Sequence, residues 1–304
     1  MKKAASFALG CKVNQYESEA IAELFAEKGY EIVGIDEEAD VYVINTCTVT
    51  NFGDKKSRQL IRKVKRQNEN AIVAVVGCYA QTAPKELMEI AGVNLVIGTK
   101  DRAQIVEMVE QYDRANGVEN HVSDIMKERV FEPLSIQKLA NRTRAYLKIQ
   151  DGCSQYCSYC IIPYARGPIR SREPQEVVAE VKRLAENGFK EVVLTGIHVA
   201  SYGKDRRDTS LLDILKQVHE VEGIERIRFS SIEPNVVTEE FAQTMAALPK
   251  VCDHFHLSLQ SGCDATLERM NRRYRSAEYK ERCELLRKYF GNPALTTDVI
   301  VGFP

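Results

Sequence analysis

The first hundred residues alternate between short apolar runs and longer amphipathic stretches. The apolar runs are rich in β-branched residues, as buried strands are, and cover 4–9, 41–45, 71–76 and 95–97. The stretches between them carry apolar residues at helical spacing and cover 17–28, 55–67, 84–91 and 103–113. Strands that alternate with helices form a parallel sheet covered on both faces, so the pattern predicts a doubly wound α/β domain over 1–115.

A second series of strands and helices follows a polar linker predicted over 116–143. The expected strands cover 144–150, 191–195, 226–230, 254–259 and 295–301. The expected helices between them cover 176–187, 211–221, 238–248 and 277–290. Five β/α repeats predict an α/β domain of barrel type over 144–304, in which loops after the strand ends hold the active site.

Composition and charge add the broad class. The chain has 304 residues, of which 44% are hydrophobic and 28% charged, and its net charge is -1, so it neither favours nor excludes a polyanionic partner. The apolar start at 4–9 is shorter than the roughly 7–15 residues of a secretory core. No run approaches the roughly 18 apolar residues of a membrane span. We expect a two-domain cytoplasmic protein with no membrane partner.

Three cysteines with C-x3-C-x2-C spacing are the most informative motif: Cys153, Cys157 and Cys160. A cubane iron–sulfur cluster has four irons, so three thiolates leave one iron open to another ligand. A structural zinc site normally closes with a fourth ligand, and the nearest histidines are His121 and His198. The spacing predicts a reactive cluster in a reducing compartment; a closed zinc site or an electron carrier is the alternative.

Three further cysteines each follow a predicted strand by one to three residues: Cys11, Cys47 and Cys78. The carboxyl ends of parallel strands share one edge of a sheet, where ligands bind. These cysteines are separated by 36 and 31 residues, yet they can converge there. The alternative is that each is a buried structural cysteine. Three equivalent positions favour a second three-ligand cluster.

On these residues the chain resembles the radical S-adenosylmethionine (SAM) methylthiotransferases. The resemblance is carried by the two cysteine triads and by the motifs GCKVNQYESE (10–19), NTCTVT (45–50), GCYAQ (77–81), PYARG (163–167), RSR (170–172), SSIEP (230–234) and LSLQSG (257–262). Lys12-Val13 and the 48–50 segment are similar to the branch that acts on N6-threonylcarbamoyladenosine (t6A) in tRNA. The branches for isopentenyladenosine tRNA and for a ribosomal protein side chain are the alternatives, and a non-enzymatic iron–sulfur or zinc protein is a further one.

The resemblance implies cofactors and contacts. It implies two [4Fe–4S] clusters, one on each cysteine triad, and SAM at the first barrel strands. Further candidates for SAM contact lie beside the triad or at strand ends: Tyr159, Gly196, Ser231, Glu233 and Gln260. For Gly196, a simple turn glycine is an equal alternative. The implied reaction converts t6A at position 37 to its 2-methylthio derivative, with the tRNA anticodon loop and a reducing electron donor such as flavodoxin as partners.

A basic stretch offers a candidate RNA contact. It holds seven cations and no acid: Lys55, Lys56, Arg58, Arg62, Lys63, Lys65 and Arg66. As a helix it has a narrow apolar stripe, so several cations must point outward, towards RNA phosphates or simply towards solvent.

The last residues, 298–304, lie inside the fifth barrel-strand motif. The resemblance implies that family members continue with another β/α unit and a small RNA-binding β-barrel, which these 304 residues lack. We expect either a fragment or a truncated natural product.

Overall fold

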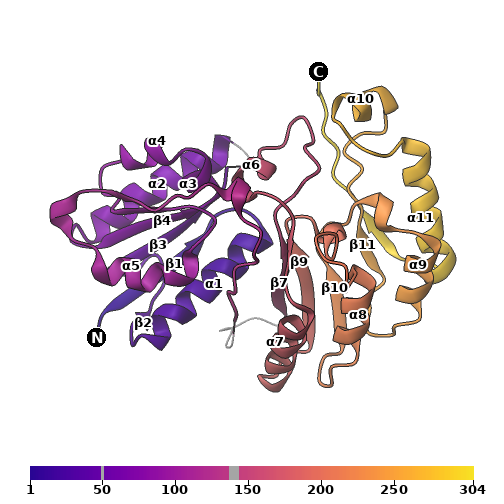
Figure 1. The fold of residues 1–304 in the computed structure, drawn as a ribbon, viewed down its shortest axis with the longest axis horizontal. Coiled ribbons are helices and arrows are strands. Elements are labelled where there is room, and N and C mark those ends of the chain that lie inside the picture. Colours follow the sequence, from indigo (N-terminus) through magenta and orange to yellow (C-terminus); the bar gives the residue numbers. More distant parts are fainter. Residues whose placement is uncertain (49–50, 137–143) are drawn as a thin grey trace. The chain divides into compact units, whose positions relative to one another are not determined.

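A computed structural model describes residues 1–48, 51–136 and 144–304. The chain divides into two compact units. Unit 1 comprises Met1–Leu139 and Ile161–Pro168, and unit 2 comprises Ala140–Cys160 and Ile169–Pro304. Figure 1 shows both units in sequence colours. Two residues of the second cysteine motif, Val49 and Thr50, and positions 137–143 of the predicted linker lie outside the described residues.

Unit 1 is built on a parallel sheet in the order β2-β1-β3-β4-β5-β6. Its strands are β1 (Lys3–Ala8), β2 (Glu31–Ile32), β3 (Val41–Thr46), β4 (Ile72–Gly77), β5 (Leu95–Ile97) and β6 (Glu119–Asn120). Register is continuous from β1 to β3 and from β3 to β4. The four predicted strands are present, and the sequence pattern missed the two-residue strands β2 and β6 at the sheet edges.

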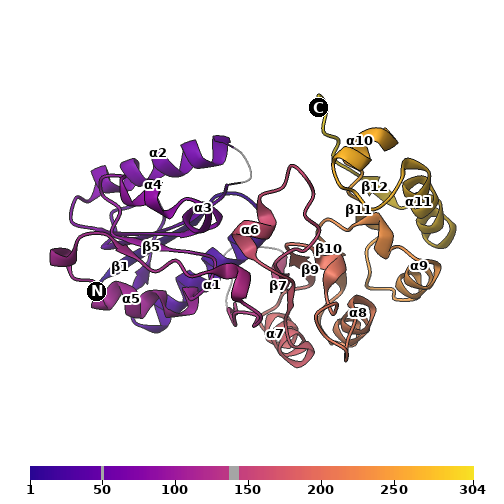
Figure 2. The ribbon, with the colours of Figure 1, turned by 45° about the horizontal axis from the view of Figure 1, so that its top comes forward.

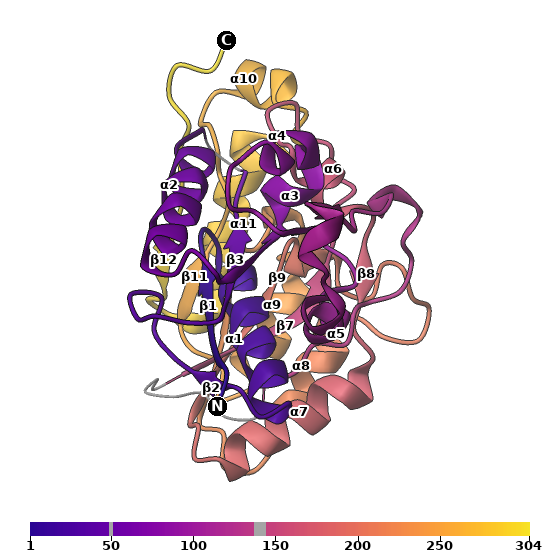
Figure 3. The same ribbon diagram turned by 90° about the vertical axis from the view of Figure 1, so that its left-hand side faces the viewer.

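Helices cover both faces of this sheet. They are α1 (Lys12–Glu27), α2 (Asn51–Gln67), α3 (Cys78–Thr82), α4 (Pro84–Met88), α5 (Ile105–Gln111) and α6 (Ile162–Arg166), with the 3₁₀ turns η1 (Arg102–Gln104), η2 (Arg114–Asn116) and η3 (Ile125–Lys127). Alternate residues of β3 point to opposite faces. Tyr42 and Ile44 pack with Ile61 of α2, whereas Val43 packs with Ile21 of α1. Helices α2 and α5 therefore stand on opposite sides of the sheet (Figure 3).

Two segments of unit 1 depart from the predicted boundaries. The region predicted as a linker packs onto the unit, since Ile125 and Leu134 are each 2% exposed and the Tyr16 hydroxyl donates to the Leu134 carbonyl at 2.5 Å. The α6 segment, predicted within 144–304, belongs to unit 1. There the Thr99 hydroxyl donates to the Ala165 carbonyl at 2.7 Å.

Unit 2 carries a four-stranded sheet in the order β10-β9-β7-β8 and a parallel pair, β11-β12. The strands are β7 (Ala145–Asp151), β8 (Arg170–Ser171), β9 (Glu191–Gly196), β10 (Arg226–Phe229), β11 (His254–His256) and β12 (Ala294–Thr296). Only β8 runs antiparallel to its neighbour among these described strands. Isolated parallel bridges at Ile227–Val251 and Ile232–Leu257 extend the series from β10 to β11.

The helices of unit 2 follow the strands in sequence. They are α7 (Pro174–Glu186), α8 (Leu211–His219), α9 (Glu239–Ala246), α10 (Asp264–Arg269) and α11 (Ser276–Phe290), with the 3₁₀ turns η4 (Val199–Ser201) and η5 (Pro234–Val236). Helices α7, α8, α9 and α11 line one side of the strand series in chain order (Figure 2). This open, mostly parallel β/α series is consistent with the α/β domain of barrel type that the sequence predicted. Within the described residues, no helix has the length and hydrophobicity needed to span a bilayer.

Candidate functional site

The three early cysteines lie at one edge of the unit 1 sheet. Cys11 follows β1 and caps α1, Cys47 follows β3, and Cys78 follows β4 as the first residue of α3. Strands β1, β3 and β4 are adjacent in the sheet, and the strand order reverses between β1 and β3. In doubly wound sheets this switch point, at the carboxyl ends of the strands, is where ligands bind. The fold thus places the three cysteines that the sequence singled out at one edge of the sheet.

The close approach of the first two cysteine loops is visible at Gly10. Its φ is +103°, and a Cβ placed there would lie 2.7 Å from Cys47 Cβ and 2.8 Å from Cys47 Sγ. Only glycine permits both the backbone angle and the contact. The residue before Cys11 is therefore glycine because the Cys47 side chain occupies the space beside it.

A buried arginine contacts the third cysteine. Arg166 of α6 is 0% exposed and donates from Nε to Cys78 Sγ at 3.2 Å. Its other nitrogens donate to Glu17 Oε1 at 2.6 Å and to Asn14 Oδ1 at 2.6 Å. Asn14 Oδ1 also accepts from Cys11 Sγ at 3.7 Å. Arg166 therefore joins two of the three cysteines through one hydrogen-bonded cluster.

The carboxylate that holds Arg166 is shared with a second arginine. Glu17 is 0% exposed, and its Oε2 lies 2.6 Å from Arg102 NH1. Arg102, equally buried, also pairs with Glu132 at 2.5 Å. Two guanidinium groups and two carboxylates alternate, and all but Glu132 are fully buried, so the charges compensate each other where water cannot solvate them. We call Glu17, Arg102, Glu132 and Arg166 the buried charge cluster.

The environment of Cys78 suits a thiolate ligand. Burial raises the pKa of the Cys78 thiol, and the Arg166 guanidinium opposes that shift. A guanidinium N–H directed at sulfur forms a charge-assisted hydrogen bond when the sulfur is a thiolate. Metal coordination deprotonates a thiol, so the donors around Cys78 fit a metal-bound sulfur.

In unit 2 the C-x3-C-x2-C triad occupies one loop after β7. Cys153 is buried, and Cys157 and Cys160 are half-buried. Burial raises the pKa of the Cys153 thiol to about 11. The Cys160 amide donates to the Cys157 carbonyl at 2.9 Å, which forms a tight turn between these two cysteines. All three sulfurs are thus presented from eight consecutive residues.

The segment after α10 holds this cysteine loop in place. The Ser158 amide and hydroxyl donate to the carbonyls of Met270 and Arg269, at 3.1 and 2.7 Å. Asn271 Nδ2 donates to the Tyr156 carbonyl at 2.9 Å, and Tyr156 itself has a positive φ of 51°. We call these contacts the loop clamp.

One arginine beside the clamp reaches a cysteine sulfur. Arg272 NH1 donates to Cys157 Sγ at 3.3 Å, and its guanidinium carbon lies 5.0 Å from the centroid of the Tyr274 ring. The contact parallels that of Arg166 with Cys78. No spacing in the sequence pointed to Arg272 as a partner of the cysteine loop, so this contact was missed.

Glu233 lies in the segment that follows β10 and contacts the cysteine loop. It is 6% exposed; Gln155 Nε2 donates to its Oε2 at 3.0 Å, and His198 Nε2 lies 3.3 Å from the same oxygen. Burial alone would raise the pKa of Glu233, but its contacts with His198 and the charge of Arg272 hold that pKa below its usual value. Gln155 and His198 had no sequence signal as partners of Glu233.

Two other candidate SAM contacts have defined surroundings. A Cβ at Gly196 would lie 2.9 Å from Gln150 Oε1, so close packing against β7 requires glycine there. Gln260 has a positive φ of 66° and pairs with Asp298 and Ile300 through its backbone. These contacts explain both backbones without a ligand.

The remaining two candidate SAM contacts are accessible. Ser231 is exposed, and Tyr159 is 40% exposed, with its ring edge-on to Phe303 at a centroid distance of 5.9 Å. Both therefore present side-chain surface that a ligand of unit 2 could contact.

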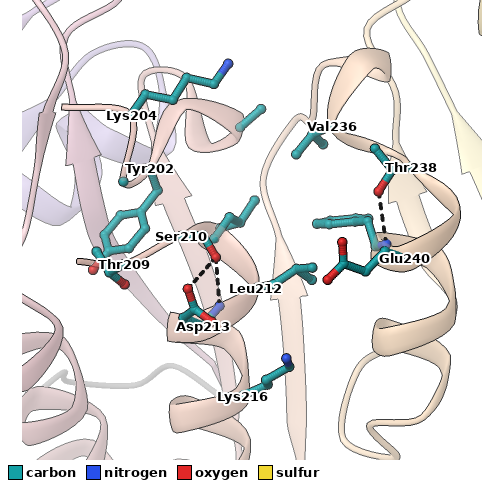
Figure 4. A pocket seen from close by; sticks show the side chains of 14 residues that line it. Tyr202, Lys204, Thr209, Ser210, Leu212, Asp213, Lys216, Val236, Thr238 and Glu240 are labelled. Carbon is teal, nitrogen blue, oxygen red and sulfur yellow. Dashed lines mark hydrogen bonds between the residues drawn. The ribbon is translucent and has the colours of Figure 1, made fainter. Parts of the chain in front are cut away.

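A cleft of about 500 Å³ lies elsewhere in unit 2, at the N-terminal ends of α8 and α9 (Figure 4). Ser210 and Thr238 cap these helices and accept from the amides of Asp213 and Phe241. The described residues that line this cleft include no cysteine and no predicted SAM contact. We therefore place the candidate chemistry at the cysteines.

The two cysteine triads differ from the ligand set of a single metal ion. In the described residues, no group of three His, Cys, Asp or Glu side chains could hold a metal ion. A cubane differs from a single ion, because each thiolate ligates a different iron. Each triad offers three thiols, and a guanidinium contacts one sulfur of each. These donors fit an iron–sulfur cubane held by three thiolates better than a single metal ion with a complete ligand set.

Comparisons with known proteins agree with this arrangement. Residues 3–98 match a family described as "Uncharacterized protein family UPF0004", and residues 147–304 match the radical SAM superfamily. A threonylcarbamoyladenosine tRNA methylthiotransferase MtaB of Bacillus subtilis is 48% identical over 100% of this chain and 68% of its own length. A tRNA-2-methylthio-N(6)-dimethylallyladenosine synthase of Dictyoglomus thermophilum is 36% identical over 97% of this chain and 68% of its own.

Among solved structures, the radical SAM methyltransferase TsrM from Kitasatospora setae has a TM-score of 0.67 at 16% identity. The match covers 98% of this chain and 67% of TsrM, and it supports the fold. Both sequence matches span the two units, and the relatives share the methylthio-transfer names. The chain therefore belongs to the radical SAM methylthiotransferase family, whose members are transferases that use [4Fe–4S] clusters and SAM.

Proposed function

We propose that this protein is a tRNA methylthiotransferase that converts t6A at position 37 to 2-methylthio-t6A. The observation that carries the proposal is the presence of two cysteine triads, one after three adjacent parallel strands of unit 1 and one in the loop after β7 of unit 2. One three-thiolate cluster suffices to start a radical reaction. A second site of the same kind, together with 48% identity to a protein named for t6A in tRNA, favours sulfur insertion into that nucleoside.

The cysteines are the proposed cluster ligands. Those of unit 1 are Cys11, Cys47 and Cys78, and those of unit 2 are Cys153, Cys157 and Cys160. When bound, the clusters and SAM supply one-electron chemistry, hydrogen abstraction, sulfur and a methyl group, none of which amino-acid side chains provide.

The chain's own residues position these groups. Arg166 and Arg272 each hold one cysteine sulfur by a hydrogen bond. Gln155 and His198 hold the carboxylate of Glu233 in the segment after β10. There it would accept a hydrogen bond from an ammonium or hydroxyl group of SAM. The remaining proposed SAM contacts are Tyr159, Gly196, Ser231 and Gln260.

A basic groove on unit 1 supports RNA as the substrate class. The groove has a volume of about 580 Å³ and lies along α2 against β1, lined by Phe7, Leu9, Lys56, Gln59, Leu60, Arg62, Lys63 and Arg66. Phe7 is 37% exposed and offers a surface for base stacking beside cations that suit phosphates.

Among the seven predicted RNA-contacting cations, two donate to part-buried partners within unit 1 and are the least available to RNA. Arg58 donates to the Tyr79 hydroxyl, and Lys65 donates to the Ala71 carbonyl. Of the predicted set, we therefore propose Lys55, Lys56, Arg62, Lys63 and Arg66 as the RNA contacts. Lys63 also pairs with Asp36 and would exchange that exposed partner for phosphate.

This function sets further requirements. The target base must leave its stack, which costs least in the single-stranded anticodon loop. A low-potential electron donor such as flavodoxin would reduce the unit 2 cluster, and the reaction would take place with tRNA in the cytoplasm.

The direct test is nucleoside mass spectrometry of total tRNA from cells with and without the gene. Deletion should remove 2-methylthio-t6A and leave t6A, and the intact gene should restore it. Unchanged 2-methylthio-t6A would contradict the proposal. Loss of 2-methylthio-dimethylallyladenosine, or of a methylthio group on a ribosomal protein, would assign one of the other branches instead.

A further inference from the structure

The two cysteine triads share a feature that the chemistry of the cysteines does not require. In each unit one cysteine sulfur accepts a hydrogen bond from an arginine: Cys78 from Arg166 at 3.2 Å, and Cys157 from Arg272 at 3.3 Å. The two arginines differ in their anchors. Arg272 rests on the Tyr274 ring and is half-buried, whereas Arg166 is completely buried and tied to the carboxylate of Glu17.

We propose that Arg166 is a positioning residue that raises the reduction potential of the iron–sulfur cluster held by Cys11, Cys47 and Cys78. This inference rests on the proposed function, because it requires a cluster on these three cysteines.

The orientation of Arg166 is determined from three sides. NH1 and NH2 both reach Glu17, at 2.6 and 3.1 Å, and NH2 also donates to Asn14 Oδ1 at 2.6 Å. These bonds leave Nε directed at Cys78. Glu17 is fixed in turn by Arg102, so the guanidinium cannot turn away from the sulfur without breaking several buried ion contacts. A lysine could supply the charge but not this planar set of donors.

The direction of the effect follows from the charge. Reduction adds one electron to the cluster, from the chemical or protein reductant, and breaks no bond. A donor N–H and a positive charge beside a ligand sulfur stabilise the more negative, reduced state, and hydrogen bonds to the sulfurs are among the factors that set cluster potentials. The low dielectric of a buried site strengthens the interaction. Loss of the Arg166 N–H should therefore make the cluster harder to reduce.

The experiment uses full-length chain in which Cys153, Cys157 and Cys160 are replaced by Ala, so that one cluster per chain remains. After anaerobic reconstitution, a potentiometric titration followed by electron paramagnetic resonance gives its midpoint potential. Arg166→Gln should shift the midpoint to a more negative value, and Arg166→Lys should fall between Gln and Arg. Arg272→Gln, which removes the equivalent arginine of unit 2, should leave this midpoint unchanged.

The outcomes separate the inference from the proposed function. If the variant with Cys153, Cys157 and Cys160 replaced by Ala (the background protein) binds no iron, the proposal of a second cluster is wrong, and the inference fails with it. Normal iron with an unchanged midpoint in Arg166→Gln would overturn the inference and leave the proposed function intact.

A second measurement covers the case in which Arg166→Gln loses its cluster. In the background protein labelled with ¹⁵N-arginine, the reduced cluster should show a weak hyperfine coupling to an arginine nitrogen. Its absence would refute the hydrogen bond on which the inference depends.

Discussion

The two units place three cysteines together in different ways. In unit 2 the three cysteines come from eight consecutive residues, and a separate segment, the loop clamp, holds that loop from outside. In unit 1 the three cysteines follow three strand ends, 36 and 31 residues apart in sequence, and the parallel sheet itself places them at one edge. The first arrangement depends on local spacing, and the second depends on the complete fold of its unit.

This difference has a consequence for stability. A loop triad can keep its spacing as long as the loop and its clamp are intact. The unit 1 triad needs correct register across β1, β3 and β4, and it needs the buried charge cluster that anchors α6 beside Cys78. Mutations far from the cysteines should therefore damage the unit 1 site more readily than the unit 2 site.

The largest expected effect separates the roles of the triads. Cys157→Ala should abolish release of deoxyadenosine from SAM under reductant, because the open-iron cluster of unit 2 cannot assemble. Cys47→Ala should retain that release but form no methylthio product. Each change should lower iron from about eight atoms per chain to about four. Chromatography of the SAM products and iron analysis check both. Deoxyadenosine release by Cys157→Ala would show that the units do not divide the reaction in this way.

The next effect is on stability and tests the buried charge cluster. Glu17→Gln leaves the guanidinium groups of Arg102 and Arg166 with one fewer carboxylate in a buried site. Breaking a buried pair from one side costs about 3–5 kcal/mol. We expect the free energy of unfolding, measured by urea titration and circular dichroism, to fall by that amount. Hydrogen exchange should locate the loss in α1 and α6.

The matched control removes an exposed partner of the same type. Glu239 pairs with Lys288 on the surface of unit 2, where solvent screens both charges. Glu239→Gln should leave the urea midpoint nearly unchanged. Equal losses for Glu17→Gln and Glu239→Gln would mean that burial of the cluster has no special importance for unit 1.

The sequence predicted the strands and both triads because these features leave local patterns. Apolar runs with β-branched residues mark buried strands, and cysteines directly after them lie at the ligand-binding edge. The same local reasoning missed β2 and β6, since two-residue edge strands have no periodicity to detect. It predicted a linker over 116–143, and Leu134 of this stretch is buried within unit 1.

The arginines at the sulfurs were missed for a different reason. Arg166 meets Glu17 across 149 residues, and Arg272 meets Cys157 across 115. A pair that forms only after two distant elements pack leaves no spacing in the sequence. The clue available was a charged residue inside an otherwise apolar or small stretch, such as Arg166 in the run 161–167, which is where a buried charge needs a partner.

A smaller effect on stability tests the contact between Glu233 and Gln155 of the cysteine loop in unit 2. The pKa of Glu233 lies below its usual value of 4.5, so its ionised form stabilises the folded state above that pH. This contribution is lost as the pH falls through the lower, folded pKa. Glu233→Gln should cost about 1.5–3 kcal/mol of unfolding free energy at pH 7. The difference from wild type should shrink as the pH falls below 4.5.

Thermal unfolding at a series of pH values measures this difference. The control is Glu240→Gln, which removes an exposed carboxylate of α9 and should change the free energy of unfolding little at pH 7. The difference in unfolding free energy between wild type and Glu233→Gln could instead stay constant from neutral to acidic pH. That result would mean that the charge of the carboxylate does not stabilise its contact with Gln155.

The smallest expected effect concerns the basic groove, where each contact with RNA is exposed to solvent. Arg62 and Arg66 line the groove, and Lys55 is exposed on the same helix, α2. Replacing each with Ala should weaken tRNA binding and reduce the slope of log affinity against log salt by about 0.7–0.9 per lost phosphate contact. Lys280→Ala removes an exposed cation from unit 2 and should leave the slope unchanged. Equal slopes for α2 variants and Lys280→Ala would move RNA recognition away from unit 1. A reduced slope for the α2 variants would instead show that unit 1 binds RNA along α2. Unit 1 would then combine RNA binding with the proposed sulfur-donating cluster at its sheet edge, and unit 2 would generate the radical.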